Sequence, residues 1–340
     1  MHLLRNRTLT SKAILAAVAN RIRLFDVYAS LKRKHIGSQV VIANYHRVTM
    51  IKDDWSCESL SPQAFESQIE YFRQNFEILS LDQLSRHLRQ DRSLPKKAVV
   101  VTFDDGYLDN YVYARPILRK YGVPATFFLT TGHIGGSRLF WWDKVGYAVE
   151  HTRKQWLELT EFGTWELPAY DRRKTRNRIV NAIRDLPEQR KNLAIEDLLR
   201  VAGVSIPDAL AKEVILSWEE VVEMSEEGID FGAHTLTHPI LTNMPLEQAK
   251  LEIVQSKKDI ETKIGRQVNF FSYPNGSLNS EIVDIVKQAG FVAGVTADPS
   301  WITQESDVYR LGRIMMIGDS NRSAVLLCGL WGDLGVLRRL

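Results

Sequence analysis

The sequence predicts an α/β protein built on a distorted (β/α)7 barrel that carries a helical insertion. Seven short apolar segments have the length of buried strands, and helical patterns lie between most of them. Strand and helix in alternation indicate a parallel sheet, and 340 residues suit one undivided barrel. Seven units are one fewer than in the common eight-stranded barrel. We therefore expect an incomplete or distorted closure, with an open doubly wound sheet as the alternative.

The predicted elements alternate along most of the chain. The strands are expected at residues 40–44, 98–103, 125–130, 229–233, 268–273, 291–296 and 311–316. Helical patterns are clearest at 62–74, 110–121, 246–264 and 280–289, and Gly290 closes the last of them as a C-terminal cap. Between residues 140 and 227 the alternation gives way to Trp-containing, strongly charged helical sequence. We therefore place an insertion after the third strand.

The two ends of the chain differ from the domain predicted at 38–320. Between residues 5 and 34 lie eight Lys or Arg against one acid, Asp26. Apolar residues recur there at helical spacing, at Ile14, Val18, Ile22 and Phe25. Segment 1–37 is thus predicted to be a basic amphipathic helix that binds an anionic membrane surface, or else a helix that closes one end of the barrel. The tail, 321–340, combines Leu and Trp with Arg338 and Arg339.

The composition is that of a soluble globular protein. Hydrophobic residues make up 44% and charged residues 25%, which excludes disordered and fibrous classes. The net charge of +3, from 44 basic and 41 acidic residues, is too even to predict a nucleic-acid partner. Cys57 and Cys328 lie far apart, and no apolar run could span a bilayer. We expect a cytoplasmic protein, at the inner face of the membrane if the basic helix binds lipid.

Two predicted strands run directly into residues that can bind metal or transfer protons. The second ends in Asp104, Asp105 and Gly106, where one carboxylate can hold a cation while the other handles a proton. The fourth ends in His234 and His238, which face one way if the chain forms a helical turn. One Asp and two His form an open catalytic zinc site, although cobalt, nickel or manganese also suit it. A simple turn and a solvated helix are the structural alternatives.

Together these segments resemble the polysaccharide deacetylases with the NodB-type domain, family four of the carbohydrate esterases. Residues 102–106 (TFDDG) are similar to that family's first motif, and residues 234–239 (HTLTHP) to its second. The resemblance covers roughly residues 40–317. It implies that Asp104 is the general base and that the metal ligands are Asp105, His234 and His238.

The third motif is similar to residues 271–276 (FSYPNG) but altered. Ser272 stands where the family commonly has an arginine, so another group must orient Asp104. Arg47 and Arg313 are the two candidates. Residues 271–276 are still predicted to contribute to the oxyanion site. The resemblance implies that the backbone N–H of Asn275 helps to stabilise the developing oxyanion.

The general acid must also come from another place. Asp298 and Trp301 correspond only loosely to the fourth motif, and the fifth-motif segment lacks its usual histidine and contains Arg313. His46, at the end of the first strand, lies in a segment similar to that of poly-N-acetylglucosamine-type deacetylases, in which the histidine is placed as acid. We therefore predict His46 as the general acid; a surface histidine that hydrogen-bonds a loop is the alternative.

Aromatic and polar residues around these motifs are predicted to contact a sugar, because C–H faces of sugar rings pack on aromatic rings. The predicted substrate-binding residues are Tyr273, Pro274, Arg47, Arg313, Trp142, Asp143, Asp298 and Trp301. Core packing is the alternative for each aromatic residue among them.

These motifs predict a metal-dependent hydrolase that removes N-acetyl groups from a carbohydrate in polysaccharide or glycan-precursor metabolism. Polymers, lipid-linked precursors and nucleotide sugars all fit as N-acetylated substrates, and an O-acetyl ester needs the same site. A carbohydrate-binding or scaffold protein with impaired catalysis is one alternative, favoured by the altered third and fifth motifs. A metal-dependent phosphoesterase is another, although the chain has no Gly-rich phosphate cradle.

Overall fold

The computed structural model describes residues 39–50, 59–136, 138–168 and 171–316. Its centre is a parallel sheet with strands in the order β11-β10-β9-β6-β5-β1-β12, and β4 also pairs with β5. The strands are β1 (Gln39–Tyr45), β4 (Glu77–Ile78), β5 (Lys97–Phe103), β6 (Ala125–Leu129), β9 (Asp230–Ala233), β10 (Phe270–Ser272), β11 (Ala293–Val295) and β12 (Ile314–Met315). All seven predicted strands are present, although the last five are shorter than predicted. The predicted fold class is confirmed.

The sheet closes into a distorted barrel through the segment that leads into β12. Leu311 forms an isolated parallel bridge with Val295 of β11, and Ile314 pairs with Ala43 of β1. One short segment is thus bonded to both edge strands. Arg313 lies within this seam, between the two points of attachment.

Both faces of the sheet are buried, which explains why its strands read as continuous apolar runs. Alternate residues such as Val41 and Val99 belong to a core shared with the outer helices. Their neighbours Val40 and Val100 pack in the barrel interior with Leu81, which comes from a helix outside the sheet. The interior is therefore a packed core below the site.

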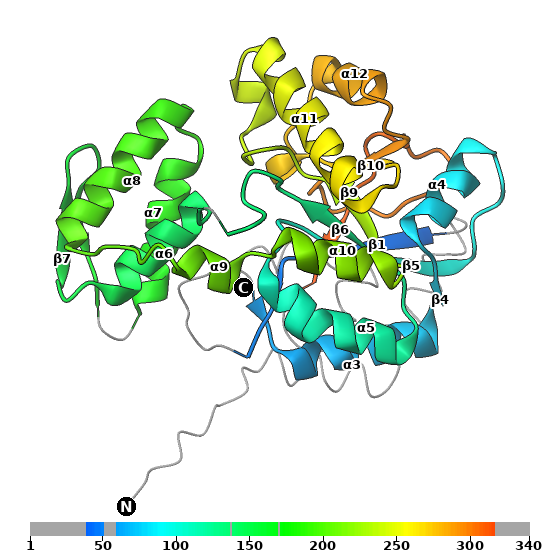
Figure 1. Cartoon of the computed structure of the whole chain (residues 1–340), viewed down its shortest axis with the longest axis horizontal. Coiled ribbons are helices and arrows are strands. Elements are labelled where there is room, and N and C mark those ends of the chain that lie inside the picture. Colours follow the sequence, from blue (N-terminus) through cyan, green and yellow to red (C-terminus); the bar gives the residue numbers. More distant parts are fainter. Residues whose placement is uncertain (1–38, 51–58, 137, 169–170, 317–340) are drawn as a thin grey trace, which may run out of the picture.

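Helices surround the barrel (Figure 1). They are α3 (Pro62–Asn75), α4 (Leu81–Arg89), α5 (Arg115–Tyr121), α10 (Trp218–Glu226), α11 (Leu246–Ile264) and α12 (Ser280–Gln288). The helix predicted at 110–121 is divided, because its first part is a π-helical turn, η1 (Asn110–Ala114). Four short elements in this part of the chain were not predicted: β2 (Arg47–Val48), β3 (Ser59–Leu60), β4 and α4. The start of α4 is marked by a capping box between Ser80 and Gln83.

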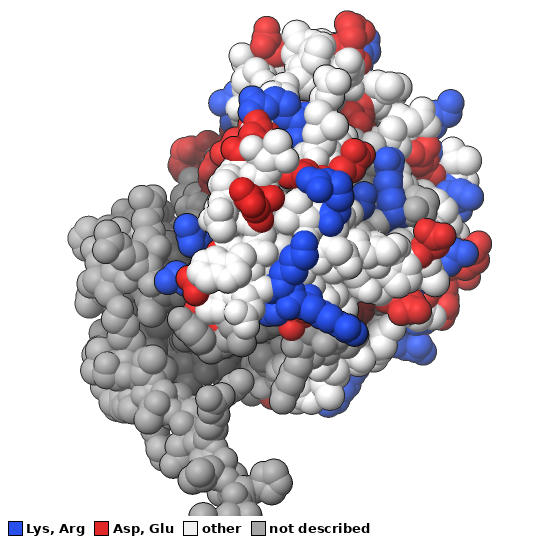
Figure 2. Space-filling view, turned by 90° about the vertical axis from the view of Figure 1, so that its left-hand side faces the viewer, with Lys and Arg blue, Asp and Glu red and all other residues white. Residues whose placement is uncertain are grey.

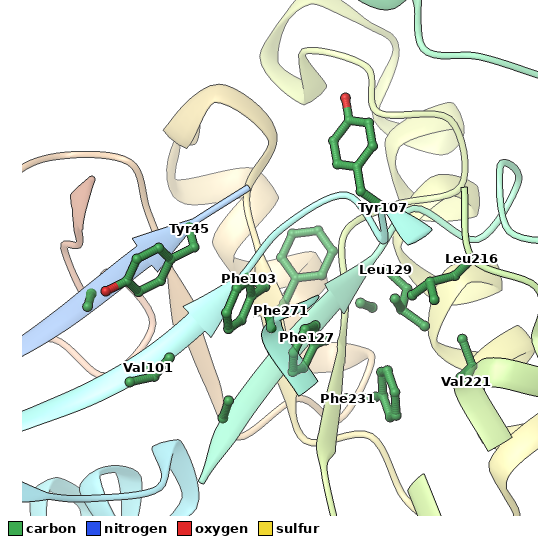
Figure 3. Packing of buried hydrophobic residues seen from close by; sticks show 14 of the residues in the cluster. Tyr45, Val101, Phe103, Tyr107, Phe127, Leu129, Leu216, Val221, Phe231 and Phe271 are labelled. Carbon is green, nitrogen blue, oxygen red and sulfur yellow. The ribbon is translucent and has the colours of Figure 1, made fainter. Parts of the chain in front are cut away.

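A row of aromatic side chains crosses four adjacent strands of the sheet (Figure 3). Tyr45, Phe103, Phe127 and Phe231 come from four adjacent strands and are paired in register. Phe103 and Phe127 stack with ring centroids 4.4 Å apart. Such cross-strand aromatic pairs stabilise a sheet. Because Phe103 immediately precedes Asp104, the row fixes the end of β5 from which both carboxylates project.

Between β6 and β9 the chain forms a lobe beside the barrel (Figure 1). Its elements are α6 (Trp141–His151), β7 (Trp156–Leu159), β8 (Gly163–Glu166), α7 (Arg172–Arg184), α8 (Glu188–Ala202) and α9 (Leu210–Val214). Residues including Val145, Leu157, Ile179 and Leu198 form a small core of its own. The antiparallel pairing of β7 with β8 departs from the purely helical insertion that we predicted. Figure 2 shows that charges of both signs are interspersed on this side of the molecule.

The segments predicted to contact a membrane, residues 1–37 and 321–340, lie outside the described residues, as do Cys57 and Cys328. Among the residues that are described, none of the helices is long and apolar enough to cross a bilayer.

Candidate active site

Polar side chains gather at the end of the barrel where β1, β5, β9 and β10 finish. His46 follows β1, Asp104 and Asp105 follow β5, His234 follows β9, and Ser272 is the last residue of β10. The carboxyl ends of parallel strands meet at one end of a barrel, which is where barrel enzymes hold their active sites. The fold thus brings the predicted base, acid and ligands to the same end of the molecule.

Asp104 is held by Arg313 in a buried ion pair. Nη1 of Arg313 donates to Oδ1 of Asp104 at 2.8 Å, and Nη2 donates to Oδ2 at 2.6 Å. The two residues are 2% and 3% exposed, so the pair is shielded from water. A bidentate guanidinium–carboxylate pair fixes the carboxylate in the plane of the fork. Of the two arginines predicted to orient Asp104, Arg313 is the one that does so.

The remaining donors of Arg313 are satisfied by the surrounding strands. Nη1 also donates to Oδ1 of Asn44 at 2.9 Å, Nη2 to Oγ of Ser272 at 2.9 Å, and Nε to the carbonyl oxygen of Thr296 at 2.9 Å. Ser272 therefore leaves room for a guanidinium that enters from the seam, and also binds it. Each guanidinium nitrogen has an acceptor, which fixes the orientation of the whole group.

The seam itself is shaped to deliver this arginine. A Cβ atom at Gly312 would lie 2.5 Å from the carbonyl oxygen of Asp298, so only glycine fits beside that carbonyl. The same carbonyl accepts a hydrogen bond from the backbone N–H of Arg313 at 3.1 Å. The side chain of Asp298 is exposed, and Trp301 precedes Ile302, which bridges Val40 at the amino end of β1. The structure thus places the backbone of Asp298 next to Arg313, whereas Trp301 adjoins a residue that pairs near the amino end of β1.

The ion pair determines the protonation state of Asp104. Burial by itself would raise the pKa of this carboxyl, but the charge and hydrogen bonds of Arg313 outweigh it and hold the pKa well below its usual range. Asp104 is therefore ionised at neutral pH and can accept a proton.

Asp105, His234 and His238 converge on one point. Oδ1 of Asp105 lies 3.6 Å from Nε2 of His234 and 3.6 Å from Nε2 of His238. This oxygen is buried and accepts no hydrogen bond from the described residues. Nδ1 of His234 lies 2.7 Å from the carbonyl oxygen of Ser272, so it carries the proton and leaves the lone pair of Nε2 for a metal. The three residues fit a divalent ion with bonds of about 2 Å.

The protonation states of these groups suit a cation. Burial raises the pKa of Asp105 to about 7; the charge of His46 opposes this shift and that of Asp104 adds to it. Burial lowers the pKa of His234 to about 4 and that of His238 well below its ordinary value. Both imidazoles are therefore neutral at neutral pH, as metal ligands must be. A buried carboxyl whose charge is disfavoured binds a positive ion readily.

The two histidines converge by a different route from the one predicted. The segment from His234 to His238 does not form the helical turn that was considered as the way to bring both rings to one side. Thr235 has a φ of 67° and His238 a φ of 61°, and the chain bends at Leu236 and Thr237 between the two histidines. The ring centroids of His234 and His238 lie 4.7 Å apart.

His46 lies beside these groups. Its side chain is half-buried, and its backbone carbonyl accepts a hydrogen bond from Nδ2 of Asn110 at 3.0 Å. The charge of His46 is a minor influence that lowers the pKa of Asp104, but it is the largest influence that opposes the rise in the pKa of Asp105, which places the imidazole near both carboxylates. This placement is compatible with the predicted role of an acid.

Arg47 belongs to a second buried cluster. Its Nε donates to Oδ2 of Asp109 at 2.6 Å, and its guanidinium lies 4.8 Å from the ring centroid of Tyr107. Tyr107 stands just beyond the end of β5 (Figure 3). Arg47 therefore holds the loop that follows Asp104 and Asp105, while Arg313 holds Asp104 itself.

The insertion lobe contributes an aromatic ring beside His238, one of the predicted metal ligands. Nε1 of Trp142 donates to the hydroxyl of Tyr107 at 2.8 Å, and this hydroxyl donates to Oδ2 of Asp143 at 3.1 Å. The Trp142 ring lies edge-on to His238 at 4.7 Å and stacks on Phe140 at 4.6 Å. Trp142 is half-buried, so a rigidly held indole remains partly open to a ligand.

In the segment that follows β10, two of the predicted side chains are buried, and the third residue, Asn275, is exposed. Tyr273 is 1% exposed and Pro274 is buried, so both pack in the protein. Asn275 is exposed and has a φ of 54°. Of the predicted third-motif residues, Asn275 is thus the one whose conformation suits a backbone contact with substrate.

Several site residues were missed at the level of sequence. Asn44 bonds to Arg313, which holds Asp104, and Glu252 bonds to the loop between His234 and His238. Tyr107 and Asp109 bond to Trp142 and Arg47, which were predicted to contact the substrate. Asn44, Tyr107 and Asp109 lie near strand ends, which was the available signal. Glu252 lies within a long helix and gave no signal.

The family model for polysaccharide deacetylase matches residues 91–294, which is more than half of the chain. The chain belongs to the polysaccharide deacetylase family. The family and the enzyme class predicted from the motifs are confirmed.

Relatives at low identity extend this match. YxkH of Bacillus subtilis is 24% identical over 261 residues, which cover 76% of this chain and 66%, just under two thirds, of that protein. A poly-beta-1,6-N-acetyl-D-glucosamine N-deacetylase of Staphylococcus aureus is 22% identical over 304 residues, which cover 85% of this chain and 82% of that relative.

Solved structures show the same fold. Deacetylase PplD of Streptococcus pyogenes, in complex with acetate, superimposes with a TM-score of 0.58 at 19% identity, covering 85% of this chain and 96% of that one. IcaB from Ammonifex degensii has a TM-score of 0.56 at 21% identity, covering 86% and 99%. This member of the polysaccharide deacetylase family thus has the same fold as these two proteins, although only about one residue in five is identical.

Proposed function

We propose that this protein is a metal-dependent deacetylase that hydrolyses the acetamido group of N-acetylglucosamine units in a glycan. The observation that carries the proposal is the pairing of two unlike centres at one strand end. Asp104 is kept ionised by Arg313, and Asp105 points a bare oxygen at two neutral imidazoles. An ionised base beside an open ligand set is the arrangement that amide hydrolysis requires.

The chain's own residues can supply each proton transfer. Asp104 takes a proton from the attacking water, whose oxygen forms a bond to the carbonyl carbon. A divalent ion held by Asp105, His234 and His238 supplies Lewis-acid polarisation, so a weakly basic Asp104 suffices. The backbone N–H of Asn275 stabilises the oxyanion. His46 then protonates the nitrogen as the C–N bond breaks, leaving acetate and a free amine.

The proposed substrate class rests on two supports. The Staphylococcus aureus relative acts, by its name, on a β-1,6-linked polymer of N-acetylglucosamine. Trp142, fixed by its bond to Tyr107 and packed beside His238, offers a face for a sugar ring next to the ligand set. A polymer therefore fits better than a nucleotide sugar, since the sequence contains no Gly-rich motif of the kind that binds phosphate.

Acetate release tests this proposal. Purified protein is stripped with a chelator, reloaded with Zn²⁺, Co²⁺, Ni²⁺ or Mn²⁺, and supplied with β-1,6-linked N-acetylglucosamine oligomers, chitooligosaccharides, O-acetylated sugars and a phosphoester. We expect metal-dependent acetate release, fastest on the β-1,6-linked oligomers. Acetate release from none of the sugars, with phosphate release from the phosphoester, would replace the proposal with a phosphoesterase. Sugar binding without any release would indicate a binding protein.

The role of His46 has its own test. A His46→Ala variant should lose far more activity on an amide than on an activated acetyl ester, whose leaving group needs no proton, and a positioned acid contributes about 10²- to 10⁴-fold. The measurement compares both substrates at equal metal loading. Equal losses on the two would assign His46 to the structure of the loop.

We also propose that segment 1–37 attaches the protein to an anionic membrane surface at the cytoplasmic face. The support is its eight basic residues against one acid, because each basic residue near such a surface contributes about 1 kcal/mol. Co-sedimentation with anionic vesicles should be lost at high salt and on removal of residues 1–37. Full-length protein that stays in the supernatant at low salt would end the proposal.

A further inference from the structure

The loop that carries both histidine ligands has a backbone that needs outside support. Thr235 and His238 are in the left-handed region, with φ of 67° and 61°. Residues other than glycine keep this conformation only where their surroundings fix it. The position of both imidazoles therefore depends on the contacts of the loop.

One side of the loop is held by the chain after β6. The backbone N–H of Thr131 donates to the carbonyl of Thr235 at 3.1 Å, and that of Gly132 donates to the carbonyl of Leu236 at 2.7 Å. A Cβ atom at Gly132 would lie 2.5 Å from the Leu236 oxygen, so this approach requires glycine. These bonds satisfy two carbonyl groups of the loop and leave the N–H groups of its central residues to be satisfied elsewhere.

Glu252, on α11, satisfies those N–H groups. Its Oε2 accepts from the backbone N–H of Leu236 and of Thr237, both at 2.8 Å, and its Oε1 accepts from the Thr237 hydroxyl at 2.7 Å. The residue is only 9% exposed. Hydrogen bonds from neutral donors to a buried carboxylate are strong, so one side chain holds the centre of the loop.

We propose that Glu252 is a positioning residue that sets the affinity of the site for its metal. It touches neither ligand and acts through the peptide groups between His234 and His238. The packing of α11 relies on other side chains, among them Ala249, Ile253 and Ile260, which are fully buried. Loss of the carboxylate thus releases the loop while the helix keeps its core contacts. The inference rests on the proposed metal site and deepens it.

Metal titration of the chelated full-length protein tests the inference with two variants. Glu252→Ala removes all three bonds, whereas in Glu252→Gln the amide oxygen can accept both N–H groups and the amide nitrogen can donate to the Thr237 hydroxyl. We expect Zn²⁺ affinity to fall by about 10- to 100-fold in the first and to stay within about threefold of wild type in the second. With Co²⁺ as the probe, the absorption spectrum should change in Glu252→Ala alone.

Glu261 provides a matched control on the same helix. Its Oε1 also accepts a backbone N–H, that of Val268 at 2.9 Å, but this residue precedes β10 at the end of the sheet away from the site. Glu261→Ala should leave metal affinity unchanged. An affinity in Glu252→Ala equal to wild type, or an equal loss in Glu261→Ala, would overturn the inference.

Amide hydrogen exchange of the metal-free protein gives a second readout that needs no bound ion. The amides of Leu236 and Thr237 should exchange faster in Glu252→Ala than in wild type or Glu252→Gln; unchanged exchange would contradict the inference. His234→Ala separates the two proposals. Undiminished metal affinity there overturns the metal site itself, and the role of Glu252 with it. A loss there with none in Glu252→Ala overturns only the role of Glu252.

Discussion

Asp104 and Asp105 are neighbours in sequence, yet they lie in opposite electrostatic environments. The Asp104 carboxylate accepts both arms of the Arg313 fork within a layer of polar groups at the mouth of the barrel. Oδ1 of Asp105 accepts no hydrogen bond from the described residues and faces two imidazole nitrogens that are themselves neutral. The negative charge of Asp104 is thus balanced by Arg313, while that of Asp105 has no positive partner among the groups that its Oδ1 faces.

This difference supports the roles proposed for the two residues. Arg313 holds the pKa of Asp104 well below its usual range despite burial, whereas burial raises the pKa of Asp105 to about 7. Titratable groups whose environments push their pKa values apart are the usual mark of divided chemical roles. A carboxylate that accepts a proton, as proposed for Asp104, must be ionised before any metal binds. A carboxylate that binds a metal, as proposed for Asp105, binds it most strongly when no other positive charge or hydrogen-bond donor is near. The comparison therefore predicts different consequences for the same substitution at adjacent positions.

The largest effect is expected at Asp105. Asp105→Asn keeps the shape of the side chain but removes the anionic ligand, so metal affinity should fall by more than about 100-fold, the upper end of the effect of outer-shell partners. Acetate release should fall to background with it. The measurement is metal content by mass spectrometry after dialysis, alongside activity. Full metal stoichiometry in this variant would remove Asp105 from the ligand set.

Asp104→Asn should separate activity from metal binding. We expect turnover to fall by about 10²- to 10⁴-fold, because a positioned base is lost, while metal content stays near that of wild type. The two neighbouring variants are compared in the same metal and acetate assays. If Asp104→Asn also lost its metal, the division between the two carboxylates would be wrong.

The fold could be predicted further than the site, and the elements show why. Strands such as β1 and β5 are buried on both faces, so their apolar runs stand out from the sequence. The two-residue strands β2, β3 and β4 are too short to produce a pattern, and the hairpin of β7 and β8 lies in charged sequence that reads as helical. Its signal is overridden by packing against the small core of the lobe.

Within the site, residues next to strand ends were predictable and residues supplied by tertiary contacts were not. Asp104, Asp105, His234 and His238 each follow a recognisable strand or motif. The choice between Arg47 and Arg313 depended on the closure of the barrel, which brings the seam beside Ser272. The backbone of the histidine loop and its support by Glu252 depend on how α11 packs, which residue spacing does not encode.

Arg313→Met removes the positive charge that pairs with Asp104. Burial then acts alone and raises the pKa of Asp104, so the base is protonated at higher pH and the acid limb of the kcat/KM profile should move upwards. Activity near neutral pH should fall by about 10- to 100-fold, less than in Asp104→Asn, because the carboxyl is still present.

Arg47→Met is the matched control for Arg313→Met. Arg47 is also buried and paired, with Nε 2.6 Å from Oδ2 of Asp109, but its partner is not the base. Both variants leave a buried carboxylate without its cation and should lose about 3–5 kcal/mol of stability. Only Arg313→Met should displace the acid limb. A limb that stays in place there would mean that another group sets the protonation of Asp104.

The smallest effect is expected at Asp143, which is fully buried in the neighbouring cluster. Burial raises its pKa to about 7, although the Arg47 guanidinium and the Tyr107 hydroxyl oppose this. The folded protein thus keeps a proton on Asp143 that the unfolded chain releases near pH 4, so this residue's contribution to stability is lost as pH rises from about 4 to about 7. Asp143→Asn has no such loss and can still accept the Tyr107 hydrogen bond.

Urea unfolding between pH 5 and 8 measures this difference. The stability of Asp143→Asn relative to wild type should rise with pH, by at most about 1.4 kcal/mol per pH unit, and level off above pH 7. Asp284→Asn, an exposed carboxylate on α12, serves as the control and should show no such rise. A difference that does not vary with pH would mean that Asp143 is ionised throughout. Arg47 would then balance the negative charge of Asp143, as Arg313 balances that of Asp104. Of these three carboxylates, only Asp105 would then need a metal ion to balance its charge.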